Sequence, residues 1–315
     1  MDKRKRRIAL VCALLLALLL GAAGYAARKT MQVYLHMRDK LNTIDENVAF
    51  SNEVLRSTFL PVKENHYEFD YSWLEAGSLV AHGLGGLEGM DRANCLEAME
   101  AAYENGFRVF EGDLMILEDQ LVLIHDEDRF CEMTGLEPGS YGFRDFQQAE
   151  IFGKYHTVDL DALLDFLAEH PDAYFITDSR YTSGPDSAYT LSLLARRALE
   201  RDENVLDRVI VQIYNQQMLS QVMSIYPFRS VIYTLYLSHD TDTEAMRFCI
   251  ESGVGAMATY AGRMTDTLAT SLTAAGIHPL VYTVNEKEQV QRLFDVGVEA
   301  VYTDFLKPAD LAGKG

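Results

Sequence analysis

Short apolar runs alternate with longer helical patterns along most of this chain. Eight runs have the length and composition of β-strands, and each but the last is followed by a helical pattern. The strand-like runs cover residues 78–83, 108–117, 173–180, 208–214, 230–237, 255–261, 279–284 and 299–304. They are apolar throughout, which is typical of parallel strands that are covered on both faces. The pattern therefore predicts a parallel sheet with helices packed outside it.

The number of units favours a closed (β/α)8 TIM barrel. Eight βα units over roughly 240 residues are close to the ~250 residues that this barrel usually takes. Several helical patterns end at glycine directly before the next strand, namely at Gly106, Gly253, Gly276 and Gly297. A doubly wound sheet is the alternative, but the glycine-rich residues 83–89 lack the G-x-G-x-x-G spacing of a dinucleotide site. The long stretch between His125 and Val158 is expected to form a lid or rim over the strand ends.

The N-terminus has the features of a membrane signal. Five consecutive basic residues, 3–7, precede twenty residues without charge, 8–27. This length suits a transmembrane helix, and the basic residues are expected to stay in the cytoplasm. We expect residues 1–29 to be a basic tip and single-pass anchor, 30–77 a stalk and lead-in, and 78–310 an extracytoplasmic barrel. A cleaved signal peptide, which would give a secreted protein, is the alternative.

The charge of the chain excludes one class of partner. Residues 1–29 carry seven Lys or Arg and one Asp, a net charge of +6, so the remainder of a chain of net charge −19 carries −25. A body this acidic repels nucleic-acid backbones, whereas it can hold a small anion through a bound cation. The cysteines of the body, Cys95, Cys131 and Cys249, form no disulfide framework or zinc spacing, and we expect free thiols.

Acidic residues and histidines stand at strand ends. Glu111 and Asp113 are two apart in a strand pattern, which points both carboxylates to one side. His125 ends the apolar run that follows them, His82 ends the first strand, and Asp178 ends the third. Strand C-terminal ends converge on one rim of a barrel. Three carboxylates without clustered Cys or His favour a hard cation, Ca²⁺ or Mg²⁺, and without one they would repel each other.

In this order, these residues resemble the motifs of the glycerophosphodiester phosphodiesterase family, within the phosphatidylinositol phospholipase C-like barrels. That family reads His-Arg-Gly, Glu-Asn-Thr at a helix start, Glu-x-Asp, His-Asp, Glu-x-Lys, Gln-Ser-Phe, Trp-Thr-Val-Asn and Thr-Asp. The corresponding residues here begin at His82, Ala93, Glu111, His125, Asp178, Gln212, Tyr282 and Thr303. The Asn94 helix start also has Glu97 three residues on, which predicts a capping box.

The resemblance implies a metal-dependent phosphodiesterase. Glu111, Asp113 and Asp178 would bind one divalent cation, while one of His82 and His125 acts as general base and the other protonates the leaving alkoxide. Arg180 and Tyr282 would contact substrate, and Asn94 and Gln212 would support the site. The substrate would be a small or lipid-derived phosphodiester such as a deacylated head group, a lysophospholipid or an envelope glycerol-phosphate polymer. The oligomeric state stays open.

Departures from the family pattern keep two alternatives open. Gly83 replaces the family Arg, a phosphate contact, Ala93 replaces the Glu before Asn94, and Asp178 is shorter than Glu. An Asp with two histidines also resembles phospholipase D-like enzymes of the same superfamily, which transfer the phosphatidyl group and give a cyclic phosphate. The second alternative is a non-catalytic anchored binding barrel.

Overall fold

The structure is a computed structural model that describes residues 66–179, 181 and 184–311. The expected anchor, most of the expected stalk, and Arg180 lie outside these residues. Within the described ranges, no helix is both long and apolar enough to cross a bilayer.

Eight parallel strands form a closed barrel, which confirms the fold expected from the alternating pattern. They are β1 (Ser78–Ala81), β2 (Val109–Leu117), β6 (Tyr174–Ser179), β7 (Val209–Ile213), β8 (Ser230–Thr234), β9 (Ala256–Tyr260), β10 (His278–Tyr282) and β11 (Ala300–Thr303). Each strand pairs with the next in chain order, and β1 pairs with both β11 and β2, which closes the ring.

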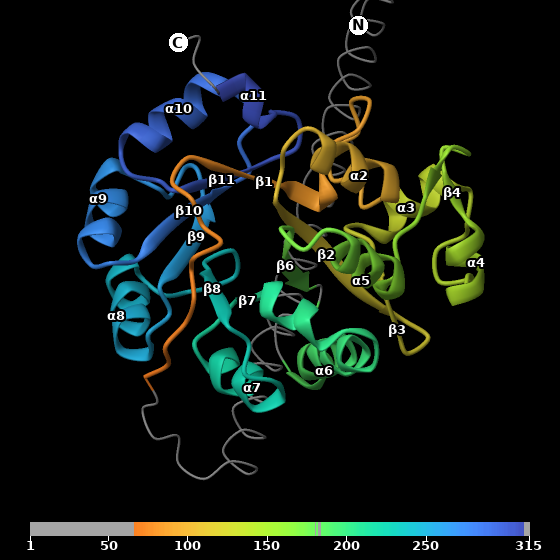
Figure 1. Cartoon of the computed structure of the whole chain (residues 1–315), viewed down its shortest axis with the longest axis horizontal. Helices are drawn as coiled ribbons and strands as arrows, with labels where there is room; N and C mark the ends of the chain where they lie inside the picture. The colour runs from red at the N-terminus through yellow and green to blue at the C-terminus, as the bar shows by residue number, and fades with distance from the viewer. Residues whose placement is uncertain (1–65, 180, 182–183, 312–315) are drawn as a thin grey trace, which may run out of the picture. The chain divides into compact units, whose positions relative to one another are not determined.

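Helices surround the barrel on its outside (Figure 1). They are α2 (Leu96–Glu104), α5 (Leu160–Glu169), α6 (Gly184–Arg201), α7 (Gln217–Ile225), α8 (Asp242–Ser252), α9 (Asp266–Ala274) and α10 (Lys287–Asp295), with the shorter η1 (His82–Leu84), η2 (Glu203–Arg208) and α11 (Pro308–Leu311). All four glycines expected to end helices have positive φ, and Gly253 is the left-handed C-cap of α8. Glycine adopts this conformation without the steric cost that other residues pay.

Apolar side chains fill the barrel interior, and residues 66–77 cover its N-terminal end. Val80, Ile176 and Leu280 are among the fully buried interior residues. Trp73 packs against the same interior cluster and donates from its indole nitrogen to Ser230 Oγ at 3.2 Å. The Tyr71 hydroxyl donates to a β8 carbonyl. The last part of the expected lead-in therefore packs on the barrel.

A folded insertion stands where a lid or rim was expected. β2 turns back through antiparallel β3 (Gln120–Leu123), and then come α3 (Glu127–Thr134), α4 (Phe143–Gln148), β4 (Glu150–Ile151) and β5 (Tyr155–His156). A separate apolar cluster that includes Phe146, Cys95 and Cys131 holds these short elements together. The three cysteines of the body are buried free thiols, as expected.

The capping box expected at Asn94 is wrong. α2 begins at Leu96, and its N-cap Cys95 makes no side-chain cap. Asn94 has a φ of +43° and turns its amide to Asp113, while the Glu97 carboxylate binds His156. The Asn94 amide is therefore occupied on both sides by Asp113, because Nδ2 donates to the carboxylate and Oδ1 accepts from the Asp113 N–H at 3.3 Å.

Candidate active site

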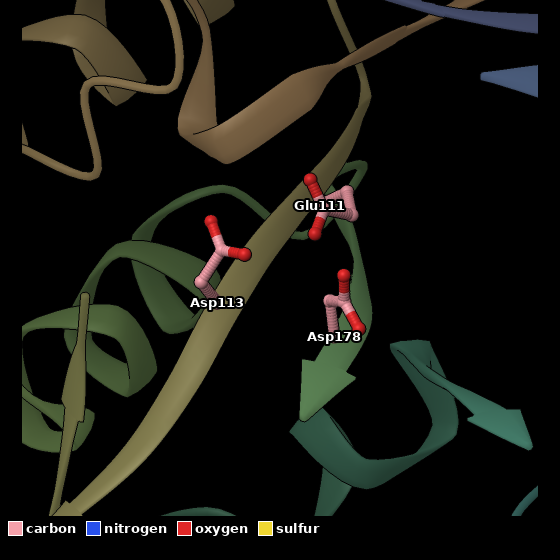
Figure 2. A group of neighbouring side chains, drawn as sticks. All are labelled: Glu111, Asp113 and Asp178. Atoms are coloured by element: carbon pink, nitrogen blue, oxygen red, sulfur yellow. The ribbon is translucent and has the colours of Figure 1, made fainter. Parts of the chain in front are cut away.

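Three carboxylates meet at the C-terminal ends of β2 and β6. Asp113 on β2 pairs in register with Asp178 on β6, and Glu111 lies two residues earlier on β2. Side chains two apart on a strand share a face, so Glu111 and Asp113 point to the same side. Figure 2 shows all three carboxylates turned toward one space. One ligand oxygen from each lies within 4.8 Å of the others, a spacing that fits one bound cation.

The raised pKa values of the three carboxylates also support a bound cation. Burial, followed by the charges of Asp113 and Asp178, raises the pKa of Glu111 well above its ordinary value. Burial raises the pKa of Asp113, and burial and the Asp113 charge raise the pKa of Asp178 to about 6. Glu111 Oε2 accepts from the Gly83 N–H at 2.8 Å, whereas the buried Oε1 has no hydrogen-bond partner in the structure. A divalent cation would satisfy this oxygen and relieve the repulsion.

Two of the carboxylates are held by neutral side chains. Asn94 Nδ2 donates to Asp113 Oδ2 at 2.7 Å. The Tyr214 hydroxyl donates to Asp178 and accepts from the Ser179 N–H. Gln212 donates to the Thr177 carbonyl, so it supports the strand and not the carboxylate itself. The Asp178 carboxylate is therefore positioned by Tyr214, two residues beyond Gln212, the expected supporting residue.

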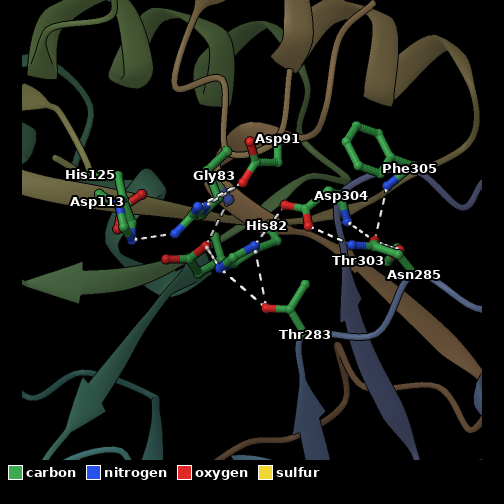
Figure 3. A network of polar contacts seen from close by, with 12 residues as sticks. His82, Gly83, Asp91, Asp113, His125, Thr283, Asn285, Thr303, Asp304 and Phe305 are labelled. Carbon is green, nitrogen blue, oxygen red and sulfur yellow. Dashed lines mark hydrogen bonds and ion pairs between the residues drawn. The ribbon is translucent and has the colours of Figure 1, made fainter. Parts of the chain in front are cut away.

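His82 is oriented by an acid from the last strand. Its Nδ1 lies 2.8 Å from Asp304 Oδ1, and because a carboxylate only accepts, Nδ1 donates. Nε2 then faces the site and lies 4.0 Å from Glu111 Oε2. Asn285 Nδ2 donates to the other Asp304 oxygen at 2.8 Å. Figure 3 shows His82 between Thr283 and Asp304, with Asn285 behind the acid.

The Asp304 carboxylate is kept in its charged form. Burial acts to raise its pKa, but hydrogen bonds from His82 and Asn285 outweigh burial and lower it. Asn285 Oδ1 also accepts from the Asp304 N–H at 2.8 Å, which fixes the acid from both sides. A fixed anion behind Nδ1 orients the imidazole and fixes its tautomer.

His125 faces a cation instead of an acid. Its Nε2 lies 3.0 Å from Arg92 Nη1. Because a guanidinium only donates, Nε2 accepts and the ring is neutral in this arrangement. Burial and then the Arg92 charge lower the pKa of His125.

The chain has a steric reason for glycine at position 83. Gly83 has a φ of +55°, and a Cβ built there would lie 2.5 Å from the Arg92 Cα. The Asn94 N–H donates to the Gly83 carbonyl at 2.8 Å, which holds the loop in this close approach. No side chain fits at position 83, and Arg92 occupies the adjacent space.

The structure thus brings together five predicted residues: His82, Glu111, Asp113, His125 and Asp178. Tyr282 is half-buried at the end of β10, where burial raises its pKa to about 12 and its ring packs edge-on against Tyr302. Its contact with substrate stays a prediction, as does that of Arg180, which is not among the described residues.

The sequence alone assigned no role in the site to Arg92, Tyr214 or Asp304. Tyr214 stands where the family motif has Phe, and its additional hydroxyl was a signal in the sequence for a polar contact at the site. Arg92 carried no such signal, because its position depends on the fold of the glycine-rich loop.

Comparison with known proteins places the chain among phosphodiesterases. The model of the glycerophosphoryl diester phosphodiesterase family matches residues 86–307. A search of curated proteins gave no match.

Solved structures share the fold at low sequence identity. A phosphodiesterase from Oleispira antarctica, solved with its product sn-glycerol-3-phosphate, is 16% identical with a TM-score of 0.61, over 76% of this chain and 96% of that one. A protein from Silicibacter pomeroyi is 17% identical with a TM-score of 0.60, over 73% and 90%. A glycerophosphodiester phosphodiesterase from Parabacteroides distasonis is 17% identical with a TM-score of 0.57, over 73% and 94%.

Proposed function

The chain belongs to the glycerophosphoryl diester phosphodiesterase family, and on that basis we propose that it hydrolyses glycerophosphodiesters or related lipid and envelope phosphodiesters with one divalent cation and two histidines. The observation that carries the proposal is the meeting of Glu111, Asp113 and Asp178 with two imidazoles at one end of the barrel. Catalytic groups of a (β/α)8 barrel gather at this end.

The three carboxylates would hold the cation. All donors are oxygen atoms, and one of them, Glu111 Oε1, is buried without a partner, which suits Ca²⁺ or Mg²⁺. When bound, such a cation withdraws charge from the non-bridging oxygens of a phosphodiester. Asn94 and Tyr214 would keep two of the carboxylates in place while the substrate enters and leaves.

The two histidines would divide the proton transfers. His125, neutral with a lowered pKa, suits the general base that removes a proton from the attacking hydroxyl or water. His82, with Asp304 behind Nδ1, suits the general acid that protonates the leaving alkoxide, because the carboxylate holds the ring with Nε2 directed into the site. When the attacking group is an adjacent substrate hydroxyl, the first product is a cyclic phosphate that water then opens.

The location of the barrel is also a proposal. The basic residues 3–7 and the uncharged residues 8–27 support an N-terminal anchor with the barrel outside the cytoplasm. An anchored barrel would work beside its membrane, where lipid-derived phosphodiesters are released. The Oleispira antarctica structure holds sn-glycerol-3-phosphate as product, and the same product class is proposed for this chain.

Cation binding is expected to weaken as pH falls. Protons compete with the cation for the three carboxylates, and the pKa of Asp178 without metal is about 6. The apparent Kd for Mg²⁺ or Ca²⁺ should therefore rise steadily below pH 6 and change much less above pH 7. Calorimetric titration between pH 5 and 8 measures this. An affinity that is independent of pH over this range would contradict binding at these carboxylates.

Product analysis tests the function itself. Incubation of the enzyme and Mg²⁺ or Ca²⁺ with glycerophosphocholine, glycerophosphoglycerol and lysophosphatidylcholine, followed by ³¹P NMR, is expected to show a phosphomonoester such as glycerol phosphate. A cyclic phosphate as the final product would indicate transferase chemistry. Absence of any product with all three substrates would contradict the proposal and favour a binding barrel.

A further inference from the structure

We propose that the guanidinium of Arg92 binds the substrate phosphate and holds it between the cation site and His125. The proposal rests on the function proposed above and adds a catalytic residue to it. Arg92 lies in the loop between η1 and α2.

The loop places two side chains on the site at once. Arg92 and Asn94 both have positive φ, +45° and +43°. Hydrogen bonds from the Asn94 N–H to the Gly83 carbonyl and from the Ala93 N–H to the Gly85 carbonyl fix this bend. The bend turns Asn94 to Asp113 and Arg92 to His125. Non-glycine residues with positive φ cost free energy, and such residues cluster at functional sites.

Asp91 holds the guanidinium in one orientation. Arg92 donates from Nε at 3.0 Å and from Nη2 at 2.7 Å to Asp91 Oδ2. Arg129 binds the other carboxylate oxygen at 2.6 Å, so Asp91 is fixed from a second side. These hydrogen bonds lower the pKa of Asp91, with that from Arg129 the largest cause. The acid therefore stays charged and keeps Nη1 directed at His125.

The guanidinium still has donors for an anion. Of its five N–H groups, two are used on Asp91 and one on His125, which leaves two. Two donors in a planar fork match two oxygens of a phosphate. The Arg92 charge also acts on the buried Asp113, where it opposes part of the rise in pKa that burial causes, so the guanidinium lies close to the cation site.

The contact between Arg92 and His125 places a positive charge beside the imidazole. His125 Nε2 accepts from the guanidinium, so the ring is neutral in this contact. His82 also acts to lower the pKa of His125, whereas Asp178 and Asp126 act to raise it. A phosphate bound by Arg92 would offset the guanidinium charge and compete for Nη1, and His125 Nε2 would then be free to accept the proton of the nucleophile.

Arg92→Gln tests this, with Arg197→Gln as the matched control. Arg197 binds Asp161 through a similar two-point contact between the outer helices α6 and α5, away from the site. In Arg92→Gln, kcat/KM and the affinity for sn-glycerol 3-phosphate with Mg²⁺ should each fall about 10- to 100-fold, the usual worth of a charged hydrogen bond. Mg²⁺ affinity should change little. The acid limb of the pH profile should move to higher pH, since Arg92 lowers the pKa of His125. Arg197→Gln should change each quantity less than about threefold.

Other outcomes separate the inference from the function on which it rests. An inactive wild-type enzyme would contradict the proposed function whatever the variants do. An active wild-type enzyme, together with an Arg92→Gln variant of unchanged phosphate affinity and kcat/KM, would overturn the inference alone. If Arg92→Gln does not fold, Arg92→Lys is tested instead. This variant keeps the positive charge and loses the planar pair of donors that the guanidinium offers to a phosphate. A several-fold weaker affinity for sn-glycerol 3-phosphate in this variant would support the inference, and wild-type affinity would overturn it.

Discussion

Asp113→Asn is expected to remove divalent-cation binding and phosphodiester hydrolysis together. The substitution deletes one anionic ligand from a shell of three and keeps the size of the side chain. Loss of the cation should lower kcat/KM by about 10³-fold or more, because a bound metal contributes several kcal/mol to transition-state stabilisation. Calorimetry with Mg²⁺ and Ca²⁺, alongside a hydrolysis assay, measures both effects.

Thermal unfolding distinguishes this loss from misfolding. Without metal, the variant should be as stable as the wild type or more stable, since it removes one of three carboxylates that repel each other. Asp172→Asn is the matched control, because Asp172 is exposed and pairs with Arg108 away from the site. An Asp113→Asn variant that still binds the cation with wild-type affinity would contradict the assignment of Asp113 as a ligand.

His82→Ala and His125→Ala are expected to differ on substrates with different leaving groups. Each should lower turnover on a natural phosphodiester by ~10²–10⁴, the usual contribution of a positioned acid or base. A nitrophenolate leaves without a proton, so His82→Ala should hydrolyse a nitrophenyl phosphodiester nearly as well as the wild type. His125→Ala should be impaired on both substrates, because the nucleophile still needs a base. Steady-state kinetics with metal affinity as a control measures this.

The opposite pattern would exchange the two roles. If His125→Ala alone recovers on the nitrophenyl substrate, His125 is the acid and His82 the base. Equal losses of both variants on both substrates would show that neither protonates the leaving group. Asp304→Asn should give a smaller loss than His82→Ala, because it acts only through the orientation and charge of His82.

The barrel could be predicted because its signals are local. Each strand is a short apolar run and several helices end at or next to glycine, and these features need no knowledge of distant contacts. The same holds for Glu111 and Asp113, whose shared face follows from strand periodicity. The insertion after β3 was harder, since short elements such as the two-residue strands β4 and β5 depend on a small core of their own.

The rest of the site depends on closure of the ring. Asp304 reaches His82 only because β11 pairs with β1, across 222 residues of sequence. Tyr214 reaches Asp178 from the neighbouring strand β7. The capping box at Asn94 failed because the Asn94 amide binds Asp113 on β2, a contact between segments 19 residues apart that the local pattern does not contain. Arg92 could not be foreseen, because the bend that places it is set by the close approach to Gly83.

A metal titration of hydrolysis tests the central claim most directly. The full chain is first freed of metal with a chelator. At a protein concentration well above Kd, it is then titrated with Mg²⁺ or Ca²⁺ while glycerol phosphate release is followed. Hydrolysis is expected to be absent at the start and to reach its maximum at one cation per chain, as a single site formed by Glu111, Asp113 and Asp178 requires. Full hydrolysis by the metal-free enzyme would contradict the account.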